Sequence, residues 1–411
     1  MSHERTRKRR LADLLVVLTA GVLLASPAFG KTGAELSGQG SEEMPILPLE
    51  EFSPSFLGGY RNVMEIDDDI VKYSAKYQVD ATLARAVCMY ESGGNADLRS
   101  GAGARGYFQV MPATFRSLRV PTNIEAGIKY LGQLVRQFGR EDYALAAYNG
   151  GPTRVARGRA MPLESLQYVI SVGTYRSVLK MHEPSVRAHA EQLRIETVRS
   201  GDDWWGLSRR LNVPLVQLRL YNPFLAARTL EPGYQVVYPL EPSQDLLEAS
   251  GGNALQYRTR LGDNYIMLAF ALGADLDELR EANELWRLQP LLPGTLLTIP
   301  FSATATFAQY RVTAGDDLSR IAGRLQADPW WIVRDNLLWD EQVHPGMVLR
   351  IRELPPPPEP PEYVVHRVGR GENLSSIAQR YHTTIRAIQQ ANSMGRTTRI
   401  RIGQRLRIRT R

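Results

Sequence analysis

The second half of the chain contains four copies of one sequence pattern, and this repeat constrains the architecture more than any other feature. Each copy has a glycine followed by an acidic residue, at Gly201-Asp202, Gly262-Asp263, Gly315-Asp316 and Gly371-Glu372. An asparagine lies 21 positions after that glycine in every copy, at Asn222, Asn283, Asn336 and Asn392. Such constant spacing indicates four copies of one structural unit, so the 411 residues form several small domains.

Each copy predicts a strand, two helices and a closing strand. In the third copy, Leu318, Ile321 and Ala322 recur at the three and four spacing of a buried helical face. The acidic residue of the turn is expected to cap the first helix by accepting hydrogen bonds from its free N–H groups. Cys88 is the only cysteine, so no intramolecular disulfide can stabilise these units, and their small cores must be tightly packed.

This arrangement resembles LysM domains, a family that binds N-acetylglucosamine-containing glycans such as peptidoglycan and chitin. The resemblance predicts units at residues 194–240, 256–300, 309–352 and 363–411. Family ligand contacts come from the loop after the first strand and the loop before the last. The resemblance therefore implies glycan contacts at Gly201, Asp202, Asn222, Gly315, Asp316, Asn336, Gly371, Glu372 and Asn392. The alternative is that these residues only form turns and caps. The second unit departs most from the family pattern and is expected to bind sugar least.

The N-terminal segment has the pattern of a secretory signal. A basic stretch precedes an apolar run from Leu14 to Ala25, and small residues follow up to Gly30. The run is shorter than the ~20 residues that span a bilayer as a helix. We expect a signal peptide over residues 1–30 and export to the periplasm or cell envelope. An uncleaved segment that associates with the membrane is the alternative.

Two segments predict connections between domains. Residues 31–59, rich in glycine, serine and proline, predict a flexible tether. Residues 353–362 predict a semi-rigid, proline-rich linker before the last repeat.

The last repeat is rich in arginine, with Arg405, Arg407, Arg409 and Arg411 on one side of a strand. A solvated strand face or attraction to an anionic surface explains this pattern. Nucleic acid is not expected as a partner of an exported protein.

Residues 60–190 predict a mainly helical domain. Asp80 is a suitable N-cap for a helix with Leu83 and Val87 on one face, and glycine at 93 predicts its end. Glu91 then lies in the last turn of an apolar helix. The helix dipole and the low-dielectric surroundings both raise the pKa of a carboxyl group there. A carboxylic acid that is protonated near neutral pH can protonate a glycosidic oxygen. From this pattern alone, an exposed glutamate at a frayed helix end is the alternative.

Several motifs occur in order around Glu91. They are Glu91-Ser92-Gly93-Gly94, Gly106-Tyr107-Phe108-Gln109-Val110-Met111-Pro112, Ala147-Tyr148-Asn149-Gly150-Gly151 and Tyr168-Val169. This set resembles the lytic transglycosylases of the lysozyme-like superfamily, in particular the soluble-lytic-transglycosylase domain. The two resemblances imply an α+β multidomain fold, with a mainly α lysozyme-like catalytic domain followed by four small βααβ LysM domains.

The resemblance implies that Glu91 is the single catalytic acid and base. Substrate-binding roles are implied for Ser92, Gln109, Met111, Tyr148 and Asn149. Ser92 is expected to hydrogen-bond near the reacting sugar, and Met111 to form part of a cleft wall. Gln109 and Tyr148 are expected to bind the N-acetyl sugars, and Asn149 to shape the site.

The motifs contain one carboxylate, whereas ordinary glycosidases need two. Asp97, Glu125, Glu141 and Asp142 lie outside the motifs, and most of them are expected at the surface. In the family, the 2-acetamido group and 6-hydroxyl of the substrate replace the second carboxylate, and no metal or cofactor is required. The expected function is non-hydrolytic cleavage between N-acetylmuramic acid and N-acetylglucosamine in peptidoglycan. The alternatives are an inactive peptidoglycan-binding scaffold and a lysozyme-type hydrolase.

Overall fold

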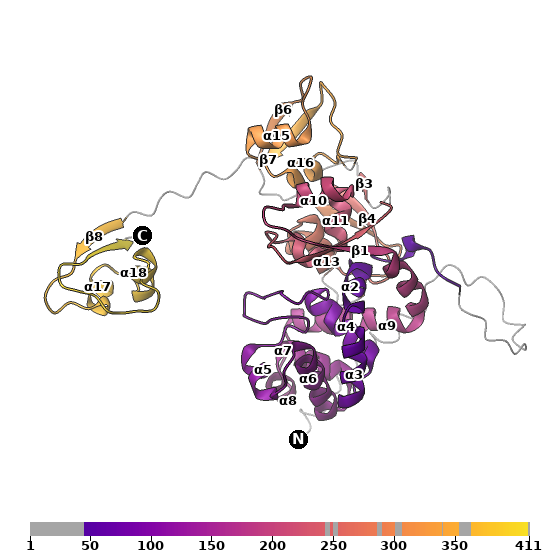
Figure 1. Ribbon diagram of the computed structural model, residues 1–411, viewed down its shortest axis with the longest axis horizontal. Helices are drawn as coiled ribbons and strands as arrows, with labels where there is room; N and C mark the ends of the chain where they lie inside the picture. Colours follow the sequence, from indigo (N-terminus) through magenta and orange to yellow (C-terminus); the bar gives the residue numbers. More distant parts are fainter. Residues whose placement is uncertain are drawn as a thin grey trace, which may run out of the picture. The chain divides into compact units, whose positions relative to one another are not determined.

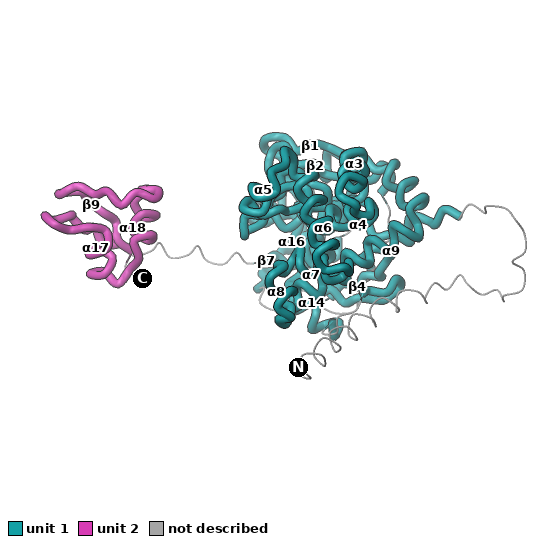
Figure 2. The backbone as a smooth tube through the Cα atoms, turned by 90° about the horizontal axis from the view of Figure 1, so that it is seen from below, with its two compact units in different colours: residues 1–352 teal, residues 353–411 magenta. Residues whose placement is uncertain are grey.

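A computed structural model describes residues 45–242, 247–249, 254–285, 290–300, 306–338, 340–352 and 363–409. The predicted signal peptide, the predicted linker at 353–362 and residues 31–44 of the predicted tether lie outside these residues. The chain divides into two compact units, Met1–Arg352 and Glu353–Arg411 (Figure 2). None of the helices within the described ranges has the length and apolarity needed to cross a membrane.

The N-terminal part of the first unit is helical, as predicted (Figure 1). Its helices are α2 (Pro54–Met64), α3 (Asp67–Tyr77), α4 (Ala81–Ser92), α5 (Pro112–Leu118), α6 (Asn123–Phe138), α7 (Glu141–Gly150), α8 (Pro152–Ala156) and α9 (Leu163–Gln192). Both predicted ends of α4 are confirmed. The Asp80 side chain accepts from the N–H of Thr82 at 2.8 Å, and Gly93 adopts the left-handed conformation. The long helix α9 is interrupted at His182, two residues before Pro184.

The predicted tether is wrong for residues 49–59. These residues form the short 3-10 helix η2 (Leu49–Glu51) and the first half of α2. Phe56 and Leu57 are fully buried in the core of the helical domain, so this segment is part of the domain. The Ser53 side chain caps α2, and Pro54 occupies its first position, where the missing N–H costs nothing. The serine–proline pair is a local helix-start signal, and the glycine and serine content of the segment concealed it.

Each repeat forms the predicted strand–helix–helix–strand unit, with antiparallel strands. The first unit contains β1 (Leu193–Thr197), α10 (Trp204–Leu211), α11 (Leu215–Tyr221), α12 (Pro223–Ala226) and β2 (Gln235–Pro239). The second contains β4 (Ala254–Arg258), α13 (Tyr265–Leu272), α14 (Leu276–Ala282) and β5 (Leu296–Pro300), and the short strand β3 (Glu248–Ala249) pairs with β4. The third contains β6 (Phe307–Arg311), α15 (Leu318–Leu325), α16 (Pro329–Asp335) and β7 (Val348–Arg352). The fourth contains β8 (Tyr363–Arg367), α17 (Leu374–Arg380), α18 (Ile385–Ala391) and β9 (Arg405–Arg409).

The repeated asparagine joins the second helix of each unit to the closing strand. In the third unit, Asn336 Nδ2 donates to the carbonyl oxygens of Ile332 at 2.9 Å and Arg350 at 2.8 Å. Its Oδ1 accepts from the N–H of Arg350 at 2.7 Å. The same three bonds are made by Asn222, Asn283 and Asn392. Both amide hydrogens are therefore engaged within the protein, and the glycan contacts expected of Asn222, Asn336 and Asn392 stay a prediction.

The acidic residue of each repeat closes the turn and does not cap the helix, contrary to prediction. Asp316 Oδ2 accepts from the N–H of Thr313 at 2.9 Å and from the Tyr310 hydroxyl at 2.7 Å. The N-cap is the following residue in every unit, namely Asp203, Asn264, Asp317 and Asn373. The helix begins one residue later than predicted because the preceding glycine has a positive φ, which lies between 81° and 87° in the four units.

The first three repeats pack against one another within the first compact unit. Arg219 of α11 is buried, its Nε donates to the Ala271 carbonyl at 2.9 Å, and its guanidinium lies 4.2 Å from the Trp330 ring centroid. Arg334 of α16 is also buried, and its Nε donates to the Leu272 carbonyl at 2.6 Å. Side chains from the first and third repeats therefore fasten both to the second.

Candidate active site

Glu91 lies in the last turn of α4, as predicted, and is partly exposed. Its Oε1 accepts a hydrogen bond from the Tyr168 hydroxyl at 2.8 Å. Desolvation raises the pKa of Glu91 to about 8, and the Tyr168 hydrogen bond opposes this rise. The carboxyl group is therefore protonated near neutral pH, which is the state that a general acid requires.

Two stacked tyrosines from α7 and α9 lie beside Glu91. The rings of Tyr148 and Tyr168 are nearly parallel, with centroids 6.5 Å apart and an interplanar angle of 8°. The Tyr148 hydroxyl donates to the Phe108 carbonyl at 2.8 Å. Burial raises the pKa of each of these two phenols well above its ordinary value. Both tyrosines therefore stay neutral and can donate hydrogen bonds at neutral pH.

The motifs included Tyr168 but did not indicate its contact with Glu91. The two residues are 77 positions apart, and no local spacing relates them. Only the packing of α4 against α9 brings the hydroxyl to the carboxyl. The ring of Tyr90, the residue before Glu91, packs edge-on against Tyr168 with centroids 5.1 Å apart. Tyr90, which is next to Glu91 in the sequence, is thus the one local feature that could have indicated an aromatic partner for the acid.

The loop between α4 and α5 is shaped by two residues that were expected to contact sugar. Ser92 is fully buried, and its Oγ donates to the Tyr107 carbonyl at 2.8 Å. The sugar contact expected of Ser92 stays a prediction, and in this structure the side chain is buried and engaged within the loop. Gln109 has a φ of +44°, and its Nε2 donates to the carbonyls of Leu98 at 2.9 Å and Gly106 at 2.8 Å. The amide hydrogens of Gln109 are thus engaged in the loop itself.

Met111 and Asn149 are accessible from solvent. Met111 is 44% exposed and occupies the N-cap position of α5. Asn149 is exposed on α7, next to Tyr148, and its Oδ1 accepts from Ser165 Oγ at 2.6 Å. This bond joins α7 to the start of α9 beside the stacked tyrosines, and the substrate-binding role of Asn149 stays a prediction.

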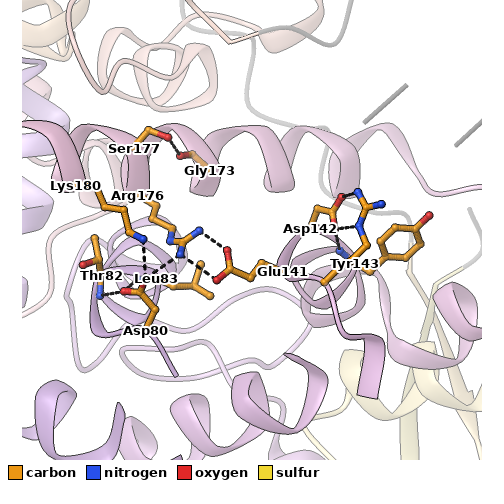
Figure 3. Close-up of polar contacts among 11 residues, drawn as sticks. Asp80, Thr82, Leu83, Glu141, Asp142, Tyr143, Gly173, Arg176, Ser177 and Lys180 are labelled. Atoms are coloured by element: carbon orange, nitrogen blue, oxygen red, sulfur yellow. Dashed lines mark hydrogen bonds and ion pairs between the residues drawn. The ribbon is translucent and has the colours of Figure 1, made fainter. Parts of the chain in front are cut away.

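Charged residues connect α4, α7 and α9 (Figure 3). Arg176 of α9 donates to Asp80 at 2.8 Å and pairs with Glu141 at the start of α7. Lys180 Nζ lies 2.9 Å from the Asp80 carboxylate. Although burial alone would raise the pKa of Asp80, hydrogen bonds from Arg176 and Lys180 bring it well below its usual range. The helices that carry Glu91, Tyr148 and Tyr168 are therefore fixed to one another by ion pairs about 16 Å along α4 from the candidate acid.

Among the described residues, no second carboxylate contributes to the pKa of Glu91. Glu125 is buried, contrary to the surface position expected for it, and accepts from Lys76 Nζ at 2.6 Å and the Tyr77 hydroxyl at 2.7 Å. The two acidic residues that begin α7 form ion pairs with arginines. Asp97 is exposed.

Family models match both halves of the chain. Residues 68–164 match the transglycosylase SLT domain, a range that includes Glu91, Gln109 and Tyr148 and ends before Tyr168. Residues 197–239, 257–300, 310–352 and 366–409 match the LysM domain. These ranges agree with the helical domain and the four βααβ units.

Curated proteins are similar over parts of the chain. A transglycosylase of Enterobacteria phage PRD1 is 41% identical over 91 residues, which are 21% of this chain and 34% of the phage protein. The soluble lytic murein transglycosylase of Salmonella typhimurium is 32% identical over 106 residues, which are 22% of this chain and 16% of that protein. Each match therefore spans about a third or less of these two relatives.

A third relative matches across the domain boundary. Membrane-bound lytic murein transglycosylase D of Escherichia coli K12 is 26% identical over 314 residues, which are 62% of this chain and 68% of that protein. A match of this length extends beyond the helical domain into the repeats. The chain thus contains a transglycosylase SLT domain followed by four LysM domains and is homologous to membrane-bound lytic murein transglycosylase D.

Proposed function

We propose that this protein is a peptidoglycan lytic transglycosylase of the periplasm or cell envelope. It cleaves the β-1,4 bond between N-acetylmuramic acid and N-acetylglucosamine without consuming water. The observation that carries the proposal is Glu91, a single carboxyl group with a pKa raised to about 8 and a hydrogen bond from Tyr168. The LysM domains imply peptidoglycan binding, which keeps the enzyme on its insoluble substrate.

One carboxyl group acts twice in this reaction. Glu91 donates its proton to the glycosidic oxygen while the acetamido oxygen of the muramic acid attacks the anomeric carbon, and the glycosidic bond breaks. The Glu91 carboxylate then removes the proton of the 6-hydroxyl, whose oxygen displaces the acetamido oxygen and closes a 1,6-anhydro ring. Between the two steps Glu91 is charged, and the Tyr168 hydrogen bond stabilises that charge. Glu91 ends protonated, as it began.

Two other functions are less well supported. A hydrolase needs a second carboxylate about 5–9.5 Å from the first. The motifs around Glu91 contain no other carboxylate, and Glu125, Glu141 and Asp142 form ion pairs with lysine or arginine. An inactive scaffold does not require a carboxyl group with a raised pKa, whereas such groups gather at functional sites. The hydrogen-bonded pair of Glu91 and Tyr168 favours an active site.

Glu91→Gln tests the proposal. The substitution keeps the shape of the side chain and removes the transferable proton. Turnover of purified peptidoglycan should fall below about 1% of the wild-type value, because loss of general acid catalysis costs ~10²–10⁴-fold. Co-sedimentation with insoluble peptidoglycan should be unchanged.

Asp97→Asn is the matched control, since it removes an exposed carboxylate near the same loop. It should leave turnover at the wild-type level. A Glu91→Gln protein that retains substantial turnover would refute the assignment of the acid. A loss of turnover in Asp97→Asn would instead favour a hydrolase with two carboxylates.

A further inference from the structure

The glycine–acid turn of the second LysM domain is buried, unlike its three counterparts. Residues 262–264 are all buried, whereas Gly201, Gly315 and Gly371 at the same position of the other domains are exposed. A Cβ atom on Gly262 would lie 2.5 Å from the Phe56 ring of α2. The helical domain therefore covers the turn that in the other LysM domains is open to solvent.

The covered turn is attached to the segment before α2 by main-chain hydrogen bonds. The Ser53 N–H donates to the Leu261 carbonyl at 2.9 Å, and the Leu261 N–H donates to the Glu51 carbonyl at 2.7 Å. The backbone beside the turn of the second domain is thus bonded to the helical domain.

A second attachment leads from the turn toward the candidate active site. Asn264 Nδ2 donates to Ser171 Oγ on α9. Ser171 Oγ also accepts from Gln167 Nε2 at 3.3 Å. Tyr168 lies one helical turn before Ser171 on α9 and packs edge-on against Tyr90, with ring centroids 5.1 Å apart. Asn264 therefore binds α9 one turn from Tyr168, whose hydroxyl donates to Glu91.

We propose that Asn264 is a positioning residue for the reaction, and that the second LysM domain uses its turn to support the enzyme and not to bind glycan. This inference rests on the proposed function. The buried hydrogen bond of Asn264 fixes α9 at Ser171, and α9 carries the hydroxyl that stabilises the Glu91 carboxylate between the two proton transfers. Loss of this bond should lower kcat and leave KM nearly unchanged. The interaction that it weakens joins Tyr168 to Glu91 and is not a contact with the substrate.

Asn264→Ser separates the two roles of this side chain. Asn264 Oδ1 caps α13 by accepting from the N–H groups of Ile266 at 2.8 Å and Met267 at 3.4 Å. Serine caps helices about as well as asparagine, so the cap is retained. The shorter serine lacks the amide donor that reaches Ser171. Asp275→Ser is the matched control, because Asp275 is the exposed N-cap of α14 in the same domain.

The experiment compares the full-length variants on soluble glycan strands prepared from peptidoglycan, over a range of pH. Asn264→Ser should lower kcat about ten- to a hundredfold, since a displacement of about 1 Å at a catalytic group has effects of this size. The alkaline limb of its kcat profile should move to higher pH, because a weaker Tyr168 hydrogen bond leaves Glu91 with a higher pKa. Asp275→Ser should match the wild type. Wild-type kcat and pH profile in Asn264→Ser would overturn the positioning role.

Ser171→Ala removes the same contact from the other side and replaces Asn264→Ser if that variant does not fold. It should reproduce the lower kcat and the shifted profile. The double variant should be no worse than the more severe single variant, since Ser171→Ala already removes the bond that Asn264→Ser removes. Independent, additive losses would contradict the inference.

An inactive wild type would contradict the proposed function, whereas an active wild type with unaffected variants would contradict the positioning role alone.

Discussion

Desolvation and one hydrogen bond act in opposite directions on the carboxyl group of Glu91. Desolvation favours the neutral acid and is the larger effect, so the pKa is raised to about 8. The Tyr168 hydrogen bond favours the carboxylate, the form that exists after the first proton transfer. Because the reaction starts from the protonated acid, turnover should fall as the pH rises through about 8.

Tyr168→Phe should change this pH dependence in a defined direction. Without the hydroxyl, the carboxylate loses stabilisation, the pKa of Glu91 rises further, and the alkaline limb of the kcat profile moves to higher pH. Turnover at the optimum should fall about tenfold or more, since a hydrogen bond to a charged group contributes ~1.5–3 kcal/mol. Stopped assays on soluble glycan strands across the pH range measure both effects.

Tyr148→Phe is the control for this shift, because the Tyr148 hydroxyl donates to the Phe108 carbonyl and not to Glu91. Its alkaline limb should coincide with that of the wild type. A Tyr168→Phe profile with an unmoved or lowered alkaline limb would show that the phenol does not stabilise the carboxylate.

Local signals predicted the elements whose ends are marked by particular side chains. Helix α4 was predicted correctly because Asp80 and Gly93 determine its two ends through bonds to neighbouring residues. For the first helix of each repeat, the predicted N-cap lies one residue before the observed one. Each repeat has two neighbouring side chains after the glycine that can accept hydrogen bonds. Only the geometry of the turn decides which of the two caps the helix. The partner of Glu91 could not be predicted, because the bond to Tyr168 depends on the packing of two separate helices.

The asparagine of the fourth domain provides a prediction at this scale. Asn392→Ala removes three hydrogen bonds between α18 and β9 and should lower the free energy of opening of this domain by about 1–3 kcal/mol. Hydrogen exchange of backbone amides in β9 and α18 measures the change. If Asn392 instead contacted glycan, the variant would lose affinity for peptidoglycan with no loss of amide protection.

At the scale of the whole molecule, the sequence predicted the domains and their order but not their attachment. The repeats were expected to be four small domains, and the fourth is a compact unit of its own. The first three are joined through buried side chains such as Arg219 and Arg334, which the sequence pattern places among ordinary charged helix residues. The burial of the turn at Gly262 explains why the second domain departs from the family pattern, since that turn contacts protein.

The chemistry of the cleaved end tests the central claim most directly. Purified peptidoglycan is digested in ¹⁸O-labelled water, and the released fragments are analysed by mass spectrometry. If Glu91 acts alone, with the nucleophile supplied by the substrate, every new end is 1,6-anhydro-N-acetylmuramic acid, one water lighter than a hydrolysis product and free of label. Reducing muramic acid ends that carry ¹⁸O would show that water attacks the anomeric carbon, and would contradict the account.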